Sequence, residues 1–397
     1  MKLSERSKVI KPSVTLALAA KAQAMRAQGI DLVNFTAGEP DFDTPQRIKD
    51  AAVEALRKGM TKYTDVRGIE PLRQAVTEKY LKEFGLRYSK DEVLISCGGK
   101  HALYNIFQAL IDPGDEVIIP SPYWVSYSDM ALLAGGVPRL IRTIEQNGFR
   151  ITPEELEGAM TSKTRAFVLN SPGNPTGAAY SHDELTALSR VLEQHECLIL
   201  SDDIYEKIIY DGFRFHSIVA LNPKLRERTI IFNSVSKSYA MTGWRIGYAL
   251  GPAAAISAAA KIQSQSTSNA TSFAQVAAIE ALAGPQDEVQ QMVNEFQKRR
   301  ELIVKRLHAM PGITCLNPQG AFYVFPNVSS LLGKEAGGKK LASAGDVVEY
   351  FLTEARVLAV PGEDFGSTEN IRISYATSLQ EIEKGCERIA AAIRKIG

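Results

Sequence analysis

The feature that most constrains the fold is a regular alternation, between residues 93 and 250, of short apolar runs with segments of helical character. Helical patterns cover residues 100–111 and 182–194, and Ser181 with Glu184 forms a capping box before the second helix. Short apolar strands that alternate with helices indicate a mainly parallel sheet covered on both faces, and therefore an α/β fold. The predicted strands are residues 93–96, 116–120, 166–170, 198–202, 229–234 and 246–249.

The pattern changes after the Gly284-Pro285 pair. Residues 287–310 have the pattern of one long charged helix, and shorter mixed elements follow it. The expected later elements are a strand at 321–325, a Gly/Lys-rich loop at 333–340, a helix at 346–354, strands at 356–360 and 370–375, and a last helix containing residues 382–393. We expect the first 40 or so residues, with a helix at 14–28 and a strand at 32–35, to join this part. The sequence thus predicts a large domain at 45–285 and a smaller α+β domain made of 1–44 and 286–397.

Composition excludes several classes of protein. The 397 residues carry 46 Lys+Arg and 45 Asp+Glu, so a net charge of +1 gives no electrostatic reason to expect nucleic acid or an anionic membrane as a partner. The four cysteines form no C-x-x-C pair and the five histidines no H-E-x-x-H motif, so we expect free thiols and no metal site. No segment has the length and hydrophobicity of a leader or a membrane helix, and we expect a soluble cytoplasmic protein.

Residues 234–247, Ser-Val-Ser-Lys-Ser-Tyr-Ala-Met-Thr-Gly-Trp-Arg-Ile-Gly, are the most informative segment. Lys237 follows directly on a predicted strand end, where ligands bind in parallel sheets. A lysine there can form a Schiff base, and the neighbouring hydroxyls with Arg245 can bind a phosphate. A solvated loop lysine is the plain alternative. An S-x-x-K acyl enzyme is a weak one, because the required K-T-G and S-D-N motifs are missing.

Two further segments place polar groups after strands. In residues 201–205, an apolar strand brings Asp202 to its carboxyl end, where it could bind Mg²⁺, pair with a cationic ring nitrogen or simply cap a helix. In residues 170–177, two prolines and two glycines fix a rigid loop, and the proline after Asn174 holds that residue extended. An ordinary rigid turn is the alternative for the second segment.

Two more segments suit anions. Residues 96–102, Ser-Cys-Gly-Gly-Lys-His-Ala, pass from a strand through glycines into a helix, and the amides of such a helix start bind anions. There is neither a Walker loop nor a G-x-G-x-x-G, so a Rossmann dehydrogenase lacks its signature. In residues 370–375, strand alternation separates Arg372 and Ser374 from the apolar face, and arginine suits bidentate carboxylate binding.

Together these segments resemble the class I aminotransferases of fold type I that depend on pyridoxal 5'-phosphate (PLP), and within them the bacterial aspartate aminotransferase subgroup. The resemblance covers nearly the whole chain and includes residues 36–42, 62–64 and 121–124. It implies the fold type I architecture, a mainly parallel large domain with a smaller α+β domain. It also implies a ping-pong transfer of the amino group from L-aspartate to 2-oxoglutarate, with prephenate or glutamate as possible further substrates.

The resemblance also implies the role of each site residue. Lys237 matches the Schiff-base lysine, Asp202 the partner of the pyridine nitrogen, and Trp124 the aromatic residue stacked on the ring. The ligands of the ring's phenolic oxygen match Tyr205 and Asn174. The phosphate cradle matches Ser234, Ser236, Arg245 and the amides of Gly99 and Lys100, with Tyr63 donated by the other subunit of a homodimer with shared sites. The clamp on the substrate α-carboxylate matches Arg372 and the Gly38 backbone.

Acidic substrates need a further cation for their second carboxylate. The stretch 264–269 has no arginine that could bind this carboxylate. The positions that the bacterial subgroup associates with dicarboxylate binding match Lys100 and Lys11, with Thr15 as a polar neighbour. A solvated terminal charge is the alternative for Lys11. The other functions weighed are an aromatic or broad-range aminotransferase and a PLP-binding sensor domain of a transcription regulator. The roughly 40 residues before the cofactor domain are too few for the DNA-binding module of such a regulator.

Overall fold

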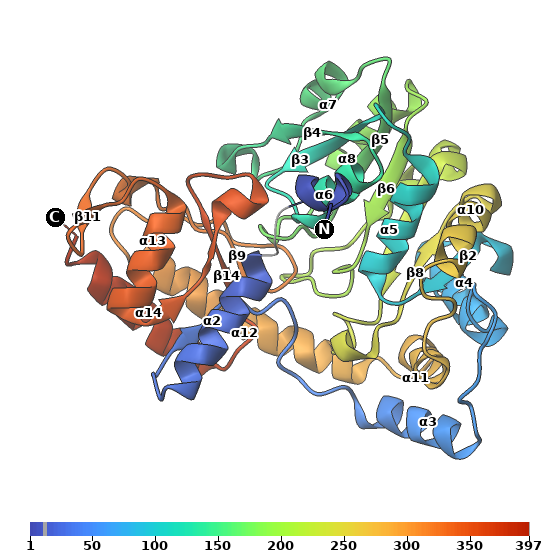
Figure 1. Cartoon of the computed structure of the whole chain (residues 1–397), viewed down its shortest axis with the longest axis horizontal. Coiled ribbons are helices and arrows are strands. Elements are labelled where there is room, and N and C mark those ends of the chain that lie inside the picture. The colour runs from blue at the N-terminus through green and yellow to red at the C-terminus, as the bar shows by residue number, and fades with distance from the viewer. Residues whose placement is uncertain (11–13, 397) are drawn as a thin grey trace.

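A computed structural model describes residues 1–10 and 14–396, without the side chains of residues 14–19. Its centre is a seven-stranded sheet with the order β2-β8-β7-β6-β5-β3-β4, whose strands fan out across the upper and right part of Figure 1. Six strands run in one direction and β8 runs opposite to them, so the predicted mainly parallel sheet is confirmed. The strands are β2 (Val93–Ser96), β3 (Glu116–Ser121), β4 (Val137–Arg142), β5 (Thr164–Asn170), β6 (Leu198–Asp202), β7 (Thr229–Ser234) and β8 (Gly247–Leu250).

Apolar residues on both faces explain why the inner strands read as continuous hydrophobic runs. Along β5, Phe167 and Leu169 belong to one buried cluster and Val168 to another on the opposite face. Helices cover both faces, as expected for parallel strands. The helices of this part are α3 (Gln46–Arg57), α4 (Glu70–Phe84), α5 (Gly99–Leu110), α6 (Ser126–Leu133), α7 (Pro153–Ala159), α8 (His182–Glu193), α9 (Ile218–Leu221), α10 (Ala253–Ser264) and α11 (Ser272–Ala283).

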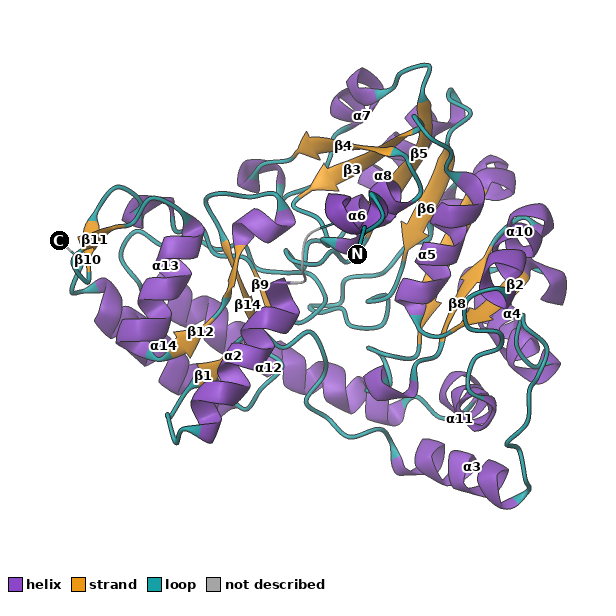
Figure 2. Cartoon of the chain, in the orientation of Figure 1, coloured by secondary structure: helices purple, strands orange, loops and turns teal. Residues whose placement is uncertain are grey.

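The remaining elements come from both ends of the chain (Figure 2). The parallel pair β1 and β12 joins Val33 to Val357, so the early residues pack with the late ones, as expected. Strands β13, β14 and β9 form an antiparallel sheet, and β10 pairs with β11. The elements are α1 (Arg6–Val9), α2 (Val14–Ala27), β1 (Val33–Asn34), α12 (Asp287–His308), β9 (Tyr323–Val324), β10 (Glu335–Ala336), β11 (Lys339–Lys340), α13 (Ala344–Tyr350), β12 (Val357–Leu358), β13 (Val360–Pro361), β14 (Ile371–Ser374) and α14 (Leu379–Ile393).

The structure corrects several predicted elements. The loop predicted at 333–340 contains the β10–β11 hairpin, and the strand predicted at 356–360 is divided between β12 and β13. The helix predicted at 346–354 begins at Ala344 and ends in a π-helical segment, Phe351–Ala355. Strand β4 was not predicted. It lies at the sheet edge, is only partly buried and contains a proline and two arginines, so it lacks the apolar signature of a buried strand.

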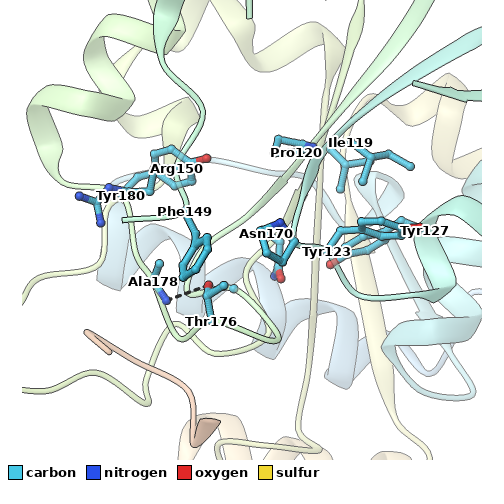
Figure 3. A pocket seen from close by; sticks show the side chains of 13 residues that line it. Ile119, Pro120, Tyr123, Tyr127, Phe149, Arg150, Asn170, Thr176, Ala178 and Tyr180 are labelled. Carbon is cyan, nitrogen blue, oxygen red and sulfur yellow. Dashed lines mark hydrogen bonds between the residues drawn. The ribbon is translucent and has the colours of Figure 1, made fainter. Parts of the chain in front are cut away.

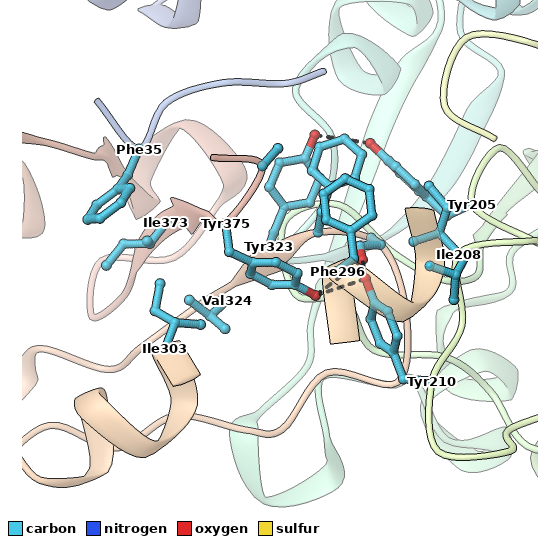
Figure 4. Close-up of a cluster of buried hydrophobic side chains, with 14 of the residues drawn as sticks. Phe35, Tyr205, Ile208, Tyr210, Phe296, Ile303, Tyr323, Val324, Ile373 and Tyr375 are labelled. Atoms are coloured by element: carbon cyan, nitrogen blue, oxygen red, sulfur yellow. Dashed lines mark hydrogen bonds between the residues drawn. The ribbon is translucent and has the colours of Figure 1, made fainter. Parts of the chain in front are cut away.

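An aromatic cluster joins the two parts of the chain (Figure 4). Phe296 of α12 stacks on Phe322 at 5.3 Å and meets the edge of Tyr375 at 6.3 Å. The hydroxyl of Tyr375 donates to the carbonyl of Ala321 over 3.1 Å, and the hydroxyl of Tyr210 donates to the same carbonyl. These contacts fix β9 and β14 against the loop that follows β6.

The described helices include none with both the length and the hydrophobicity needed to cross a membrane. The four cysteines are free, as the sequence predicts.

Candidate functional site

A cavity of about 700 Å³ lies at the carboxyl ends of the parallel strands, where ligands bind in open α/β sheets. Asn170 ends β5 and Asp202 ends β6, and the two residues are paired in register. Elements of the second part, among them β9 and β14, supply the facing wall. Sequence-predicted residues that line this cavity are Gly38, Lys100, Trp124, Asn174, Asp202, Tyr205, Lys237 and Arg372.

Asp202 is a buried carboxylate with both oxygens held. The hydroxyl of Tyr127 donates to Oδ2 over 2.6 Å, and the amide of Ile204 donates to Oδ1 over 3.3 Å. Burial raises the pKa of the Asp202 carboxyl to about 6, against the lowering effect of these hydrogen bonds and of the positive charge of Lys237. Asp202 is therefore mainly ionised at neutral pH and can stabilise a cation placed in the cavity.

Lys237 follows β7 in a short turn, and its Nζ donates to the carbonyl oxygen of Gly38. Burial lowers the pKa of the Lys237 amine to about 8. Glu39 and Asp202 oppose this shift, while Arg372 and Arg245 add to it. A large fraction of the amine is thus neutral near pH 8, the form in which nitrogen is a nucleophile and a proton acceptor.

We expect the reactivity of the Lys237 amine to rise with pH through a midpoint near 8, because only the neutral amine attacks an acylating reagent. Competitive labelling of cofactor-free protein, followed by peptide mass spectrometry, measures this midpoint. Lys261, exposed on α10, is the reference in the same digest. A midpoint for Lys237 at the ordinary lysine value of 10.5 would contradict the burial argument.

One end of the site has the character of an anion cradle. Gly98 has φ +93°, and a Cβ there would lie 2.5 Å from an Arg245 nitrogen, so glycine lets the guanidinium approach the start of α5. Gly247 is similarly close to the backbone of Gly99, with an added Cβ 2.2 Å from its nitrogen. Ser234 ends β7, and its hydroxyl accepts from the Ser236 amide over 3.1 Å. Helix amides, hydroxyls and an arginine together fit a phosphate group.

The opposite end holds a buried arginine. Arg372 donates from one terminal nitrogen to Asn174 Oδ1 over 3.1 Å and from the other to the Thr36 carbonyl over 3.0 Å. Its guanidinium lies between the rings of Tyr323 and Phe365, at 4.6 Å and 4.9 Å from the centroids. Burial lowers its pKa, and its Nε has no hydrogen-bond partner among the described residues. A carboxylate is the group that best satisfies such an arginine.

Aromatic groups line the middle of the cavity. Trp124 meets the edge of Tyr127 with centroids 5.3 Å apart, and the Lys100 ammonium lies 4.9 Å from the Trp124 ring centroid. The hydroxyls of Tyr205 and Tyr323 are 3.1 Å apart. A flat ring placed beside Trp124 would therefore have Asp202 and the hydroxyl of Tyr205 among the groups around it.

Figure 3 shows a second, much smaller cavity of about 30 Å³. It shares Tyr123, Tyr127 and Asn170 with the main cavity. The ring of Phe149 and the Thr176–Ala178 turn also line it, with the Ala178 amide donating to the Thr176 hydroxyl over 3.2 Å. It is too small for an amino acid, so the larger cavity is the candidate site.

Not every predicted site residue lies in the cavity. Gly99, Ser234, Ser236 and Arg245 form the adjoining cradle. Tyr63 is 90% exposed and outside the cavity of its own chain. Lys11 and the side chain of Thr15 fall outside the described residues, so their role stays a prediction.

Two residues of the site were missed by the sequence reasoning. Tyr127 is three residues beyond Trp124, and helical spacing after the Ser-Pro-Tyr-Trp motif was the only signal for it. Tyr323 lies in a strand predicted only as an apolar run. Both act through contacts with residues more than 70 positions away, Asp202 for Tyr127 and Tyr205 for Tyr323.

Known proteins resemble this chain over almost its whole length. A family model described as aminotransferase class I and II matches residues 30–389. A protein of Geobacillus stearothermophilus named aspartate aminotransferase is 49% identical over 98% of both chains. One of Cereibacter sphaeroides named aspartate/prephenate aminotransferase is also 49% identical over 98% of both chains.

Solved structures are similar over the whole chain. The aspartate aminotransferase of Rhizobium meliloti superposes with a TM-score of 0.97 at 46% identity, covering 100% of both chains. The Thermus thermophilus aspartate aminotransferase with maleate superposes with a TM-score of 0.93 at 43% identity, covering 99% of this chain and 100% of the other.

Proposed function

This chain belongs to the class I and II aminotransferases, and we propose on that basis that it uses PLP to transfer the amino group of L-aspartate to 2-oxoglutarate. One observation carries the proposal. A single cavity brings together the carboxylate of Asp202, the amine of Lys237 with its lowered pKa, and the buried guanidinium of Arg372. The names of the full-length relatives supply the acidic substrate.

The residues present fit PLP. Asp202 would hold the ring nitrogen protonated, and Trp124 would stack on the ring. The hydroxyl of Tyr205 and the amide of Asn174 would bind the ring oxygen. The proposed phosphate ligands are Ser234, Ser236, Arg245 and the amides of Gly99 and Lys100. PLP, when bound, supplies an electron sink for the bonds at the substrate α-carbon.

The chain's own groups perform the remaining work. The Lys237 amine would anchor the cofactor and, when free, would take the α-proton and return a proton as general base and acid. Its pKa of about 8 suits both directions of proton transfer near neutral pH. Arg372 and the Gly38 backbone would hold the substrate α-carboxylate, satisfying the Arg372 Nε.

The second carboxylate of aspartate needs its own cation, because a buried unpaired charge costs several kcal/mol. Arg372 is used by the α-carboxylate and Arg245 by the phosphate. Lys100 is the further cation on the cavity wall, and burial with the nearby charge of Arg245 lowers its pKa. The maleate bound by the Thermus thermophilus relative is itself a four-carbon dicarboxylate. We propose Lys100 as the main ligand, assisted by Lys11 and Thr15.

Lys100→Ala is expected to lower kcat/KM for aspartate and prephenate far more than for neutral amino acids. The loss of a charged hydrogen bond to an acidic substrate weakens transition-state binding by roughly 2–5 kcal/mol. Initial rates with acidic and neutral donors, together with the PLP affinity of the variant, make the test. Equal losses for both donor classes would show that Lys100 serves the cofactor or the fold instead.

The proposed function is tested by initial rates with a panel of amino donors and 2-oxo acids. We expect parallel double-reciprocal lines, the sign of a ping-pong cycle, with aspartate and glutamate preferred over aromatic donors. Preference for aromatic donors would replace the proposal with an aromatic or broad-range aminotransferase. Prephenate belongs in the panel because relatives are named for it.

Four further parts of the proposal come from the sequence, and the first of them rests on the family resemblance. We propose a homodimer in which Tyr63 of each subunit reaches the phosphate end of the other site. We also propose a cytoplasmic location and no nucleic-acid or membrane partner. The domain boundaries proposed are 45–285 for the large domain, with 1–44 and 286–397 as the small one.

A further inference from the structure

The segment that carries Tyr63 is held in place by buried side chains of two distant helices. This segment, residues 60–69, connects α3 to α4 and is called here the Tyr63 loop. Gln275 of α11 is fully buried, and its Oε1 accepts from the Ile69 amide over 2.8 Å. Its Nε2 donates to the Thr64 hydroxyl over 3.1 Å. One side chain thus ties the residue next to Tyr63 to the far end of the loop.

Further contacts hold the Tyr63 loop in the same position. Gln263 of α10, also fully buried, donates to the Val66 carbonyl over 2.7 Å, and the Ser272 hydroxyl donates to the Met60 carbonyl over 2.8 Å. Gly68 has φ +95°, and a Cβ there would lie 2.4 Å from Ile95 and 3.1 Å from Gln275 Oε1. The loop backbone is therefore closely packed.

The Tyr63 side chain, which this loop carries, has no partner among the described residues of its own chain. Tyr63 is 90% exposed, and among the described residues it makes neither a hydrogen bond nor a ring contact. Ordering a loop costs about 1–2 kcal/mol per residue in free energy. The hydrogen bonds of Gln275, which span the loop, fix the position of the exposed phenol. A phenol held and exposed in this way is available to a recipient outside the chain.

We propose that Gln275 is a positioning residue that acts across the subunit boundary, holding Tyr63 ready for the phosphate end of the partner's site. This inference rests on the proposed homodimer with shared sites. The amide of Gln275 suits the task because it donates and accepts at once, and no apolar residue of the same size can make both bonds.

The test uses mixed dimers that combine a Lys237→Ala chain with a chain that keeps Lys237. The site that keeps Lys237 takes its Tyr63 from the Lys237→Ala chain. Gln275→Met is placed either in the Lys237→Ala chain, on the side that donates Tyr63, or in the chain that keeps Lys237. Both dimers then contain the same substitutions, so a general loss of stability affects them equally. The readout is the dissociation constant of PLP at the site that keeps Lys237, measured by absorbance titration of the cofactor-free dimers.

We expect that constant to rise about tenfold when Gln275→Met is on the donating side, the size of one lost hydrogen bond to a charged group, and less than twofold in the other arrangement. Equal effects in both arrangements, or no effect in either, would overturn the inference. Thr64→Val, which removes only the Thr64 hydroxyl, replaces Gln275→Met if that variant does not fold, and the same asymmetry is expected.

Tyr63→Phe in the same two arrangements is the matched control. It must show the donating-side effect if Tyr63 serves the partner's site. Its failure to do so would overturn both the shared site and the inference. An asymmetry for Tyr63→Phe without one for Gln275→Met would leave the proposed homodimer standing and overturn the inference alone. The aminotransferase activity of the unmodified protein tests the proposed reaction separately.

Discussion

Lys237→Ala is expected to lower the transamination rate by at least ~10⁴-fold, the upper range for a single proton-transfer group. The reason is that this buried amine, which donates to the Gly38 carbonyl, would both anchor the cofactor and move the α-proton. Steady-state assays with aspartate and 2-oxoglutarate measure the loss. Circular dichroism should show an unchanged fold.

Lys261→Ala is the matched control, because Lys261 is exposed on α10 and away from the cavity. It should keep the full rate. A Lys237→Ala enzyme with near-normal turnover would show that the assignment of Lys237 is wrong.

Asp202→Asn is the second large effect that we expect, a rate loss of about 10²–10³-fold or more, as for the removal of one fixed electrostatic group in an enclosed site. A neutral amide cannot hold the pyridine nitrogen protonated. The Tyr127 hydroxyl would lose its charged acceptor as well. The rate with aspartate and the PLP affinity should both fall.

Asp203→Asn gives an unusually close control for this change. Asp203 is the next residue and is equally buried, but it accepts from the Ser201 hydroxyl over 2.7 Å and does not line the cavity. Burial raises its pKa well above the ordinary value, and a neutral amide costs less to bury than a carboxylate. Its rate should stay within a few fold of normal. A loss of stability without a rate effect for Asp202→Asn would show that Asp202 only stabilises the turn after β6, where it accepts from the Ile204 amide.

The central sheet could be predicted because its strands are short, apolar and followed by polar groups. Asp202 and Lys237 stand directly after buried runs, and the structure places both in one cavity. The edge strand β4 was not predicted, because its two faces are partly solvated and the apolar pattern of a buried strand is missing. The division of the strand at 356–360 was not predicted, because Val357 pairs with β1 and Val360 with β14. No local sequence pattern reveals these two pairing partners.

The site was predicted only as far as its residues carry local signals. The rigid loop of Asn174 and the alternating strand of Arg372 are visible in sequence, but the hydrogen bond between them joins residues 198 positions apart. Tyr127 and Tyr323 were missed for the same reason. The role of each site residue stays a prediction, and the roles of Tyr63, Lys11 and Thr15 come from resemblance alone.

The most direct test of the account is to reduce the PLP-loaded protein with borohydride, with and without prior L-aspartate, and to locate the pyridoxyl group by peptide mass spectrometry. Without aspartate, the label should lie on the peptide containing Lys237, at one group per chain. Excess aspartate without a 2-oxo acid should abolish the label, because the substrate amine displaces Lys237 and the nitrogen stays with the cofactor. A label on another lysine, or one that aspartate leaves unchanged, would contradict the account.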